Sequence, residues 1–108
     1  MKSFDAQYQF LQEMYQDNYY PEFLVDKIKA LLVNMADYLA EGDHQLDEIQ
    51  ERFDCMTRAI NDLAKEFEDN DSEIETVARD AIATDVIYML DWFDLAIDVE
   101  DALGERDW

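Results

Sequence analysis

The chain has 108 residues, of which 49% are hydrophobic, so it is long enough to form one domain around its own core. Its 28 acidic residues outnumber 8 basic ones and give a net charge of −20, which argues against direct binding to nucleic acid or to an anionic membrane surface. Only two glycines and one proline are present, which argues against a many-stranded β protein and favours a few long helices.

The cysteine content and the N-terminal sequence indicate the compartment. Cys55 is the single cysteine and cannot form an intrachain disulfide. The N-terminal sequence MKSFDAQYQF contains no apolar run of signal-peptide length, and no segment approaches a membrane span. We therefore expect a cytoplasmic protein with no membrane contact.

The first two predicted helices flank a proline. The first covers residues 4–16, where Phe4, Tyr8, Leu11 and Tyr15 recur at helical spacing. Tyr20 is pushed out of the helical region by Pro21, which itself fits the first turn of a helix. The second predicted helix therefore covers residues 21–40, and Gly42 is its end signal. Its apolar face consists of Leu24, Ile28, Leu31, Leu32, Met35 and Leu39.

The next two predicted helices follow polar cap signals. The third covers residues 44–68 behind a cap at Asp43. Its apolar seam alternates spacings of three and four, as in helical hairpins, and consists of Leu46, Ile49, Phe53, Met56, Ile60, Leu63 and Phe67. The fourth covers residues 72–94, because Ser72 and Glu75 form a capping-box pattern.

The end of the fourth predicted helix is apolar on nearly all sides over VIYMLDWF, so we expect it to be buried on several sides. A short fifth helix, residues 98–103, follows a cap at Asp98 and stops at Gly104. The sequence therefore predicts an all-α fold in one domain, residues 1–108. The architecture is a compact antiparallel helical bundle of about four main helices plus a short C-terminal helix.

One acidic turn resembles a calcium loop but fails the test. Asp69, Asp71 and Glu73 alternate like the first ligands of an EF-hand. The loop needs glycine at its sixth position, where this chain has Ile74, and glutamate at its twelfth, where it has Asp80. A solvated turn beside a capped helix explains these residues better.

The histidine and cysteine also predict no site. Glu41 and His44 have the E-x-x-H spacing of di-iron bundles, which need two such motifs, whereas His44 is the single histidine. Cys55 lies off the apolar seam and has no activating neighbour. The sequence therefore predicts no catalytic residue, no cofactor and no metal site.

Asp85 is the most informative polar residue. On a helical wheel it falls in the middle of the apolar arc, where an unpaired carboxylate is costly. It can be a tuned acid or base or a ligand contact, with Arg79, Tyr88 or Trp92 as neighbours. It can also be a buried hydrogen bond, to a tyrosine hydroxyl or an arginine, that fixes helix register. The second interpretation is favoured because structural networks are the commoner cause.

Aromatic residues surround the proline turn and form a candidate interaction patch, Tyr15, Tyr19, Tyr20 and Phe23. Tyrosine can pin such a turn, because it buries its ring while its hydroxyl remains in water. Partly exposed tyrosines are also good protein contacts. Both roles remain open at the level of the sequence.

Three segments, MYQDNYYPEFLVDKIKALL, SEIETVARDAIATD and the terminal RDW, together resemble a bacterial family known as a domain of unknown function, DUF5713. The likeness runs from about Met14 to Trp108 and is weaker around DHQLDEIQERFDCMTRAIND. The family implies a small bacterial protein without assigned activity, so no catalytic residue is carried over. The positions in its motif blocks are Tyr20, Pro21, Leu24, Asp26, Lys27, Ser72, Glu73, Glu75, Arg79, Asp85, Arg106 and Asp107.

Two functions are compatible with these observations. The leading hypothesis is a non-enzymatic protein-binding module that acts on a basic partner, as an immunity protein does on a toxin or a DNA mimic on a nucleic-acid enzyme. The alternative is a helical enzyme or small-ligand carrier that uses the core carboxylate of Asp85. A homodimer that buries surplus apolar surface is compatible with either.

Overall fold

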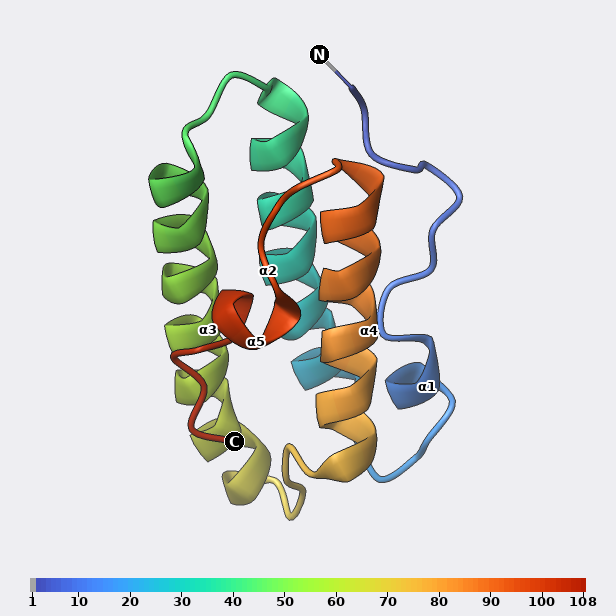
Figure 1. Ribbon diagram of the computed structural model, residues 1–108. Helices are drawn as coiled ribbons and strands as arrows, with labels where there is room; N and C mark the ends of the chain where they lie inside the picture. Colours follow the sequence, from blue (N-terminus) through green and yellow to red (C-terminus); the bar gives the residue numbers. More distant parts are fainter. Residues whose placement is uncertain (1) are drawn as a thin grey trace.

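Three long helices form the framework of the computed structural model, which describes residues 2–108. They are α2 (Glu22–Glu41), α3 (Leu46–Asp69) and α4 (Thr76–Trp92). Two four-residue helices, α1 (Gln12–Tyr15) and α5 (Val99–Ala102), are the others in this part of the chain. Figure 1 shows α2 and α3 as an antiparallel pair with α4 beside α2. Residues 2–108 contain no strand, so the prediction of an all-α helical bundle is confirmed.

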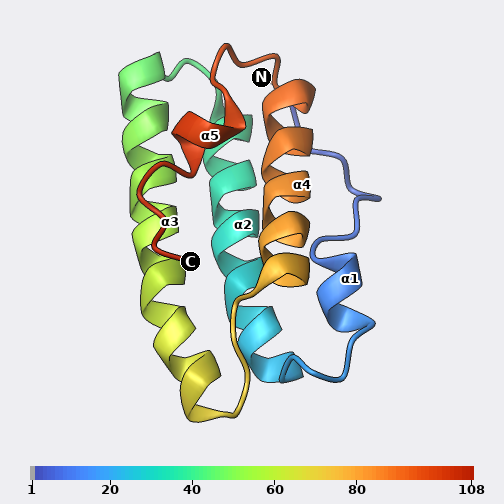
Figure 2. The same ribbon diagram turned by 60° about the horizontal axis from the view of Figure 1, so that its bottom comes forward.

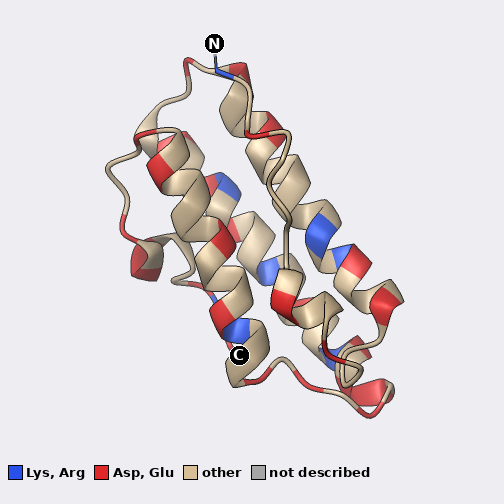
Figure 3. Ribbon diagram, turned by 90° about the vertical axis from the view of Figure 1, so that its right-hand side faces the viewer, with Lys and Arg blue, Asp and Glu red and all other residues tan. Residues whose placement is uncertain are grey.

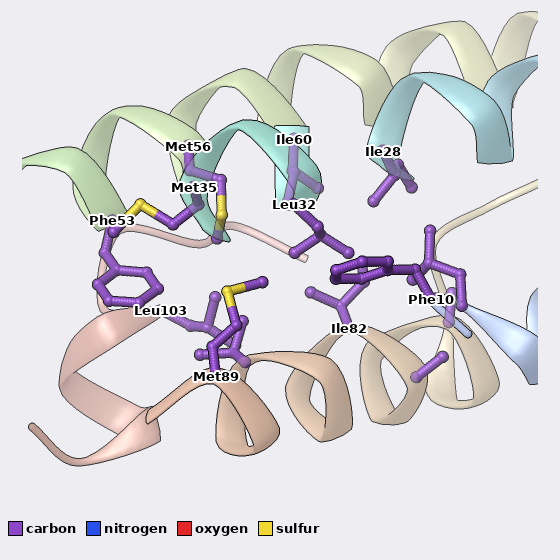
Figure 4. Close-up of a cluster of buried hydrophobic side chains, with 14 of the residues drawn as sticks. Phe10, Ile28, Leu32, Met35, Phe53, Met56, Ile60, Ile82, Met89 and Leu103 are labelled. Atoms are coloured by element: carbon purple, nitrogen blue, oxygen red, sulfur yellow. The ribbon is translucent and has the colours of Figure 1, made fainter. Parts of the chain in front are cut away.

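The predicted apolar stripes of α2 and α3 supply a large part of the core. On α3 every seam residue from Ile49 to Phe67 is buried, whereas Leu46, the first residue of the helix, is exposed. On α2 the buried stripe residues are Leu24, Ile28, Leu32, Met35 and Leu39. Figure 4 shows side chains of α2, α3 and α4 meeting in this core, with Leu103 beside Phe53 and Met89. Each fully buried leucine, isoleucine or phenylalanine stabilises the fold by about 1.5–3 kcal/mol.

Helix α4 is covered on several sides, as the apolar VIYMLDWF segment predicts. It contacts α1, α2 and α5. Val86, Met89 and Leu90 are buried, while Ile87 faces outward and is 43% exposed. A residue at the inner face of α4 is therefore surrounded by protein, which sets the environment of Asp85.

The first predicted helix, residues 4–16, is wrong over most of its length, because only Gln12–Tyr15 is helical. Residues 4–11 run along the outer side of α4 instead (Figure 1). Phe4 packs there with centroid separations of 5.6 to 5.9 Å from the rings of Tyr8, Phe10, Tyr88, Trp92 and Phe93. A helix this short is marginal by itself, so burial of aromatic rings against α4 determines the path of the segment.

Two predicted helix ends are right and one cap is wrong. Gly42 ends α2 with φ 77°, and Asp98 is the N-cap of α5. Asp43 does not cap α3: the N-cap is Gln45, whose N–H donates to Oε1 of Glu48 at 3.0 Å. Asp43 has φ 60°, so the loop turns sharply before the cap.

The predicted start of the fourth helix at Ser72 is also wrong, because α4 begins at Thr76. The N–H of Ser72 donates to the Phe67 carbonyl at 2.8 Å, and the N–H of Asp71 donates to the Glu68 carbonyl at 3.2 Å. These two bonds form a Schellman ending for α3. The buried hydroxyl of Ser72 has no hydrogen-bond partner within residues 2–108, so it caps no helix there.

The C-terminal segment lies against α3 and is held there by hydrogen bonds to Asn61. Asn61 Nδ2 donates to the Glu105 carbonyl at 2.8 Å, and the N–H of Asp107 donates to Asn61 Oδ1 at 3.1 Å.

The Cα radius of gyration is 13.5 Å, close to the value of about 13 Å expected for a compact chain of this length. None of the helices in residues 2–108 has both the length and the apolar composition needed to cross a bilayer.

Candidate functional site

Asp85 lies in the middle of α4 and is only 3% exposed. Its Oδ1 accepts a hydrogen bond from the Tyr8 hydroxyl at 2.5 Å, and its Oδ2 accepts one from the N–H of Leu11 at 2.8 Å. The Leu11 N–H is available because Leu11 is the N-cap residue of α1, in the left-handed region with φ 54°. The carboxylate therefore joins the N-terminal segment to α4.

Burial controls the ionisation of this pair. Desolvation raises the pKa of Asp85 to about 6, although the hydrogen bonds from Tyr8 and Leu11 act in the opposite direction. Burial, followed by the hydrogen bond to Asp85, also raises the pKa of Tyr8 above its usual value. At neutral pH Asp85 is therefore mostly ionised, and Tyr8 is a neutral donor.

Two residues predicted as neighbours of Asp85 form other contacts in the described chain. The Tyr88 hydroxyl donates to Asp5 Oδ2 at 2.7 Å, and the Tyr88 ring stacks on Tyr8 with centroids 4.2 Å apart. Arg79 is exposed, and its Nη2 lies 3.3 Å from Thr76 Oγ1.

The residues that bond Asp85 were missed because the sequence predicts one helix over residues 4–16. In such a helix the Leu11 N–H would bond within the helix and could not reach Asp85. The available signal was chemical. A buried carboxylate needs a donor, and a tyrosine hydroxyl is a suitable one, but nothing in the local sequence identifies Tyr8 among the tyrosines.

A surface pocket of about 430 Å³ opens beside Asp85. Tyr8 and Thr84 line it together with the carboxylates of Asp5, Glu13 and Asp85. Most of the residues that line the pocket have polar side chains, and both oxygens of Asp85 already accept hydrogen bonds. A ligand would therefore contact the surrounding side chains more readily than the core carboxylate.

The predicted aromatic patch divides into buried and exposed members. Tyr19 and Phe23 are 44% and 53% exposed. Tyr15 is less exposed, and its hydroxyl donates to Asp26 Oδ1 at 2.5 Å. Tyr20 is buried, its ring meets Phe67 edge-on at 6.4 Å, and its hydroxyl bonds to Glu75. Tyr20 therefore pins the turn, while Tyr19 and Phe23 remain at the surface.

We call this part of the molecule the tyrosine–proline end. It comprises residues 17–23, the C-terminal turn of α3 and the loop 70–75, which Figure 2 brings forward. Lys27 links it to α3, because its Nζ lies 2.7 Å from Glu66 Oε1 and 6.0 Å from the centroid of the Phe23 ring. The exposed acidic residues here are Asp17, Glu22, Glu68, Asp69, Asp71 and Glu73.

The E-x-x-H pair has a structural role. The His44 ring stacks on Tyr38 with centroids 3.8 Å apart, and its Nε2 lies 3.2 Å from Glu41 Oε1. In the described part of the chain, no group of three or more His, Cys, Asp and Glu side chains has an arrangement that could hold a metal ion.

Few of the acidic side chains at the surface form ion pairs with basic side chains of residues 2–108. The 28 acidic residues all lie within the described residues 2–108, and Asp85 is the buried one among them. Four ion pairs occur in residues 2–108, and one of them depends on protonation of His44. Figure 3 shows acidic positions spread over helices and loops with few basic positions between them.

Comparison with known proteins assigns the chain to a family. No curated protein and no solved structure matches the chain significantly. A family model described as "Family of unknown function (DUF5713)" matches residues 4–108, which include the middle of the chain. Because this match spans nearly the whole sequence, the chain belongs to the family of unknown function DUF5713.

Proposed function

We propose that this protein is a non-enzymatic binding protein that recognises a basic protein partner through its tyrosine–proline end. The observation that carries the proposal is the exposure of two aromatic side chains, Tyr19 and Phe23, on a surface whose acidic residues are largely unpaired. Aromatic side chains are frequent anchors of protein interfaces. Complementary charge speeds encounter and discourages wrong partners.

Structural need does not explain the exposure of these two rings. Tyr20 already pins the turn through Phe67 and Glu75, and Pro21 fixes the chain direction at the start of α2. Within the described chain Tyr19 meets the Tyr20 ring edge-on with centroids 5.1 Å apart, and the centroid of the Phe23 ring lies 6.0 Å from Lys27 Nζ, so a large part of each ring remains open to solvent. Their apolar surface is best explained by a partner that covers it.

The partner is expected to present a basic surface with an apolar recess. A basic toxin that this protein neutralises, or the basic groove of a nucleic-acid enzyme that it occupies, has this chemistry. Both are compatible with action in the cytoplasm, where the exposed thiol of Cys55 stays reduced.

The test begins with affinity capture of the partner and then measures binding of the purified pair. The association rate should fall steeply as the salt concentration rises, because salt screens the opposite charges that steer the two proteins together. Phe23→Ala and Tyr19→Ala should each weaken binding by about tenfold. Ile87→Ala is the matched control, since Ile87 is a similarly exposed apolar residue on α4.

A salt-insensitive association rate would exclude the electrostatic mechanism. An equal loss of affinity in Ile87→Ala and Phe23→Ala would exclude the tyrosine–proline end as the binding surface.

The pocket beside Asp85 supports a second candidate function, carriage of a small polar ligand. Its volume of about 430 Å³ lies in the range of ligand sites, about 300–1,000 Å³. A thermal-shift screen of small polar compounds should then give ligands whose stabilisation is lost in Gln12→Ala, which removes a side chain of the pocket wall. Gln16→Ala, just after the same short helix, should retain it. Ligands that stabilise both variants equally, or no ligands at all, would remove this candidate.

A further inference from the structure

A second pocket lies at the end of the bundle opposite the tyrosine–proline end, where α2 and α4 both end. We call it the helix-end pocket. It has a volume of about 280 Å³, slightly below the range of about 300–1,000 Å³ typical of small-molecule sites, so it suits a single side chain. Its apolar wall includes Leu39, Ile49 and Phe93, and Trp92 lies beside them. Asp43 and Asp94 add two carboxylates to the lining.

The electrostatics of this pocket favour a cation. The last carbonyl groups of α2 and α4 point toward this end and carry partial negative charge. No ion pair in residues 2–108 involves the carboxylates of Asp43 or Asp94. The positive N-terminus of α3 is also nearby, but Asp47 and Glu48 in its first turn offset it.

The protein's own Lys2 identifies the chemical group that fits. Its Nζ donates a hydrogen bond to the Trp92 carbonyl at 2.6 Å and lies 4.8 Å from the centroid of the Trp92 ring. An ammonium group thus gains a helix C-terminus and a cation–π contact at the same place. The Lys2 side chain is exposed, so a competing ammonium group can displace it.

We propose that the helix-end pocket binds the side chain of a lysine presented by a peptide segment, and that Lys2, which lines the pocket, holds the ammonium position at the Trp92 carbonyl when no ligand is bound. The alkyl stem of the lysine lies along the apolar wall, as long cationic side chains do on apolar surfaces. The ammonium group reaches the Trp92 carbonyl, and the carboxylates of Asp43 and Asp94, which form no ion pair with Lys2, attract it from farther away. This site is separate from the tyrosine–proline end and does not rest on the function proposed for that end.

The first experiment titrates the isotope-labelled full chain with Nα-acetyl-lysine methylamide and follows the protein by NMR. Saturable shifts are expected at the Gly42 amide and the Trp92 indole N–H, which belong to the pocket. The Trp108 indole N–H, which belongs to a different surface of the molecule, should not move. The norleucine analogue, which has the alkyl stem without the ammonium group, should give no saturable shift. Equal shifts with norleucine, or none with the lysine probe, would overturn the proposal.

Two pairs of variants test the mechanism. Lys2→Ala removes the internal competitor and should tighten probe binding by about threefold to tenfold. Lys29→Ala, which removes the same charge from an exposed position on α2, should leave it nearly unchanged. Asp94→Asn should weaken binding at least about threefold, whereas Asp37→Asn on the exposed face of α2 should not. If both members of either pair have the same effect, the pocket is not the site.

A last comparison separates a peptide lysine from a free amine. Butylamine carries the same ammonium group without the peptide backbone. It should bind at least about tenfold more weakly than the lysine probe if the peptide groups of a lysine segment contribute to binding, as the proposal requires. Equal affinity for butylamine would identify a free-amine site and overturn the assignment to a peptide lysine.

Discussion

At the residue scale, the Asp85 carboxylate is stabilised by two donors that come from a distant part of the sequence. Tyr8 and Leu11 are separated from it by 77 and 74 positions. A buried carboxylate without such donors would be strongly unfavourable. The bonds therefore make the packing of the N-terminal segment on α4 specific, which a purely apolar contact would not.

The raised pKa of Asp85 predicts how pH changes stability. The pKa is about 6 in the folded chain against 3.8 for an ordinary aspartate, so the folded state binds more protons between these values. This carboxyl therefore stabilises the fold at low pH, and the contribution is lost as pH rises through about 6. Between about pH 5 and about pH 7, the free energy of unfolding of the wild type should fall by about 1 kcal/mol relative to that of Asp85→Asn, because asparagine does not titrate. Urea unfolding of both proteins at several pH values measures the difference, and parallel curves would contradict the assignment.

The hydrogen bond from Tyr8 predicts a second effect. Tyr8→Phe keeps the ring but leaves Oδ1 of Asp85 without its donor, so the free energy of unfolding should fall by about 2 kcal/mol. Tyr88→Phe is a matched control, because it removes an equivalent bond, to Asp5, in a less buried place. It should cost about 0.5–1 kcal/mol. Denaturant unfolding at neutral pH compares the two variants. Equal falls in the free energy of unfolding would show that the burial of Asp85 does not strengthen its hydrogen bond from Tyr8.

At the element scale, the sequence predicts the long regular helices well. It predicts less well the short helix α1 and the residues, such as Ser72, whose pattern fits more than one structure. The stripes of α2 and α3 extend over many turns, so their bounds were predicted closely. The aromatic spacing of Phe4 and Tyr8 reflects packing of both rings against Tyr88 of α4, which local sequence cannot distinguish from helical periodicity. Tyr15 instead bonds to Asp26 of α2. Ser72 fits both a helix start and a helix end, and the Schellman bonds to α3 decide which.

The same limit applies to the candidate sites. The apolar arc of α4 indicates that Asp85 faces inward, because the arc depends only on local periodicity. The donors of Asp85 depend on the path of a segment that is distant in sequence, so no local pattern identifies them. Tyr19 and Tyr20 are equivalent neighbours in the sequence, and only the direction of the chain before Pro21 decides which one is buried.

The ending of α3 provides an element-scale prediction. Asp71 has φ 59°, a left-handed conformation that a side chain with Cβ disfavours and that glycine adopts freely. Asp71→Gly should therefore be more stable than Asp71→Ala by about 1 kcal/mol. Both variants remove the same charge, so the comparison isolates the backbone. Thermal unfolding measures it, and an alanine variant as stable as the glycine variant would contradict the role of the left-handed residue.

At the scale of the whole molecule, the net charge of −20 acts across the entire fold. The molecule measures 41 × 28 × 18 Å, so at an ionic strength of about 0.01 M the screening length of about 30 Å covers most of it. At about 0.1 M the length falls to about 10 Å, which is less than the shortest dimension. Repulsion between distant acidic residues is therefore removed over this range.

Salt should consequently stabilise this protein. The opposing effect, loss of the ion pairs, is small because each exposed pair contributes only about 0–1 kcal/mol and four are present in residues 2–108. We expect the free energy of unfolding to rise by about 1 kcal/mol between about 0.01 M and about 0.1 M salt, which raises the melting temperature by about 4–8 °C. Sodium and potassium chloride should act equally, because screening depends on ionic strength and not on the identity of the cation. A melting temperature that is constant, or that rises with one cation alone, would show that specific contacts and not diffuse repulsion control the stability of this acidic bundle.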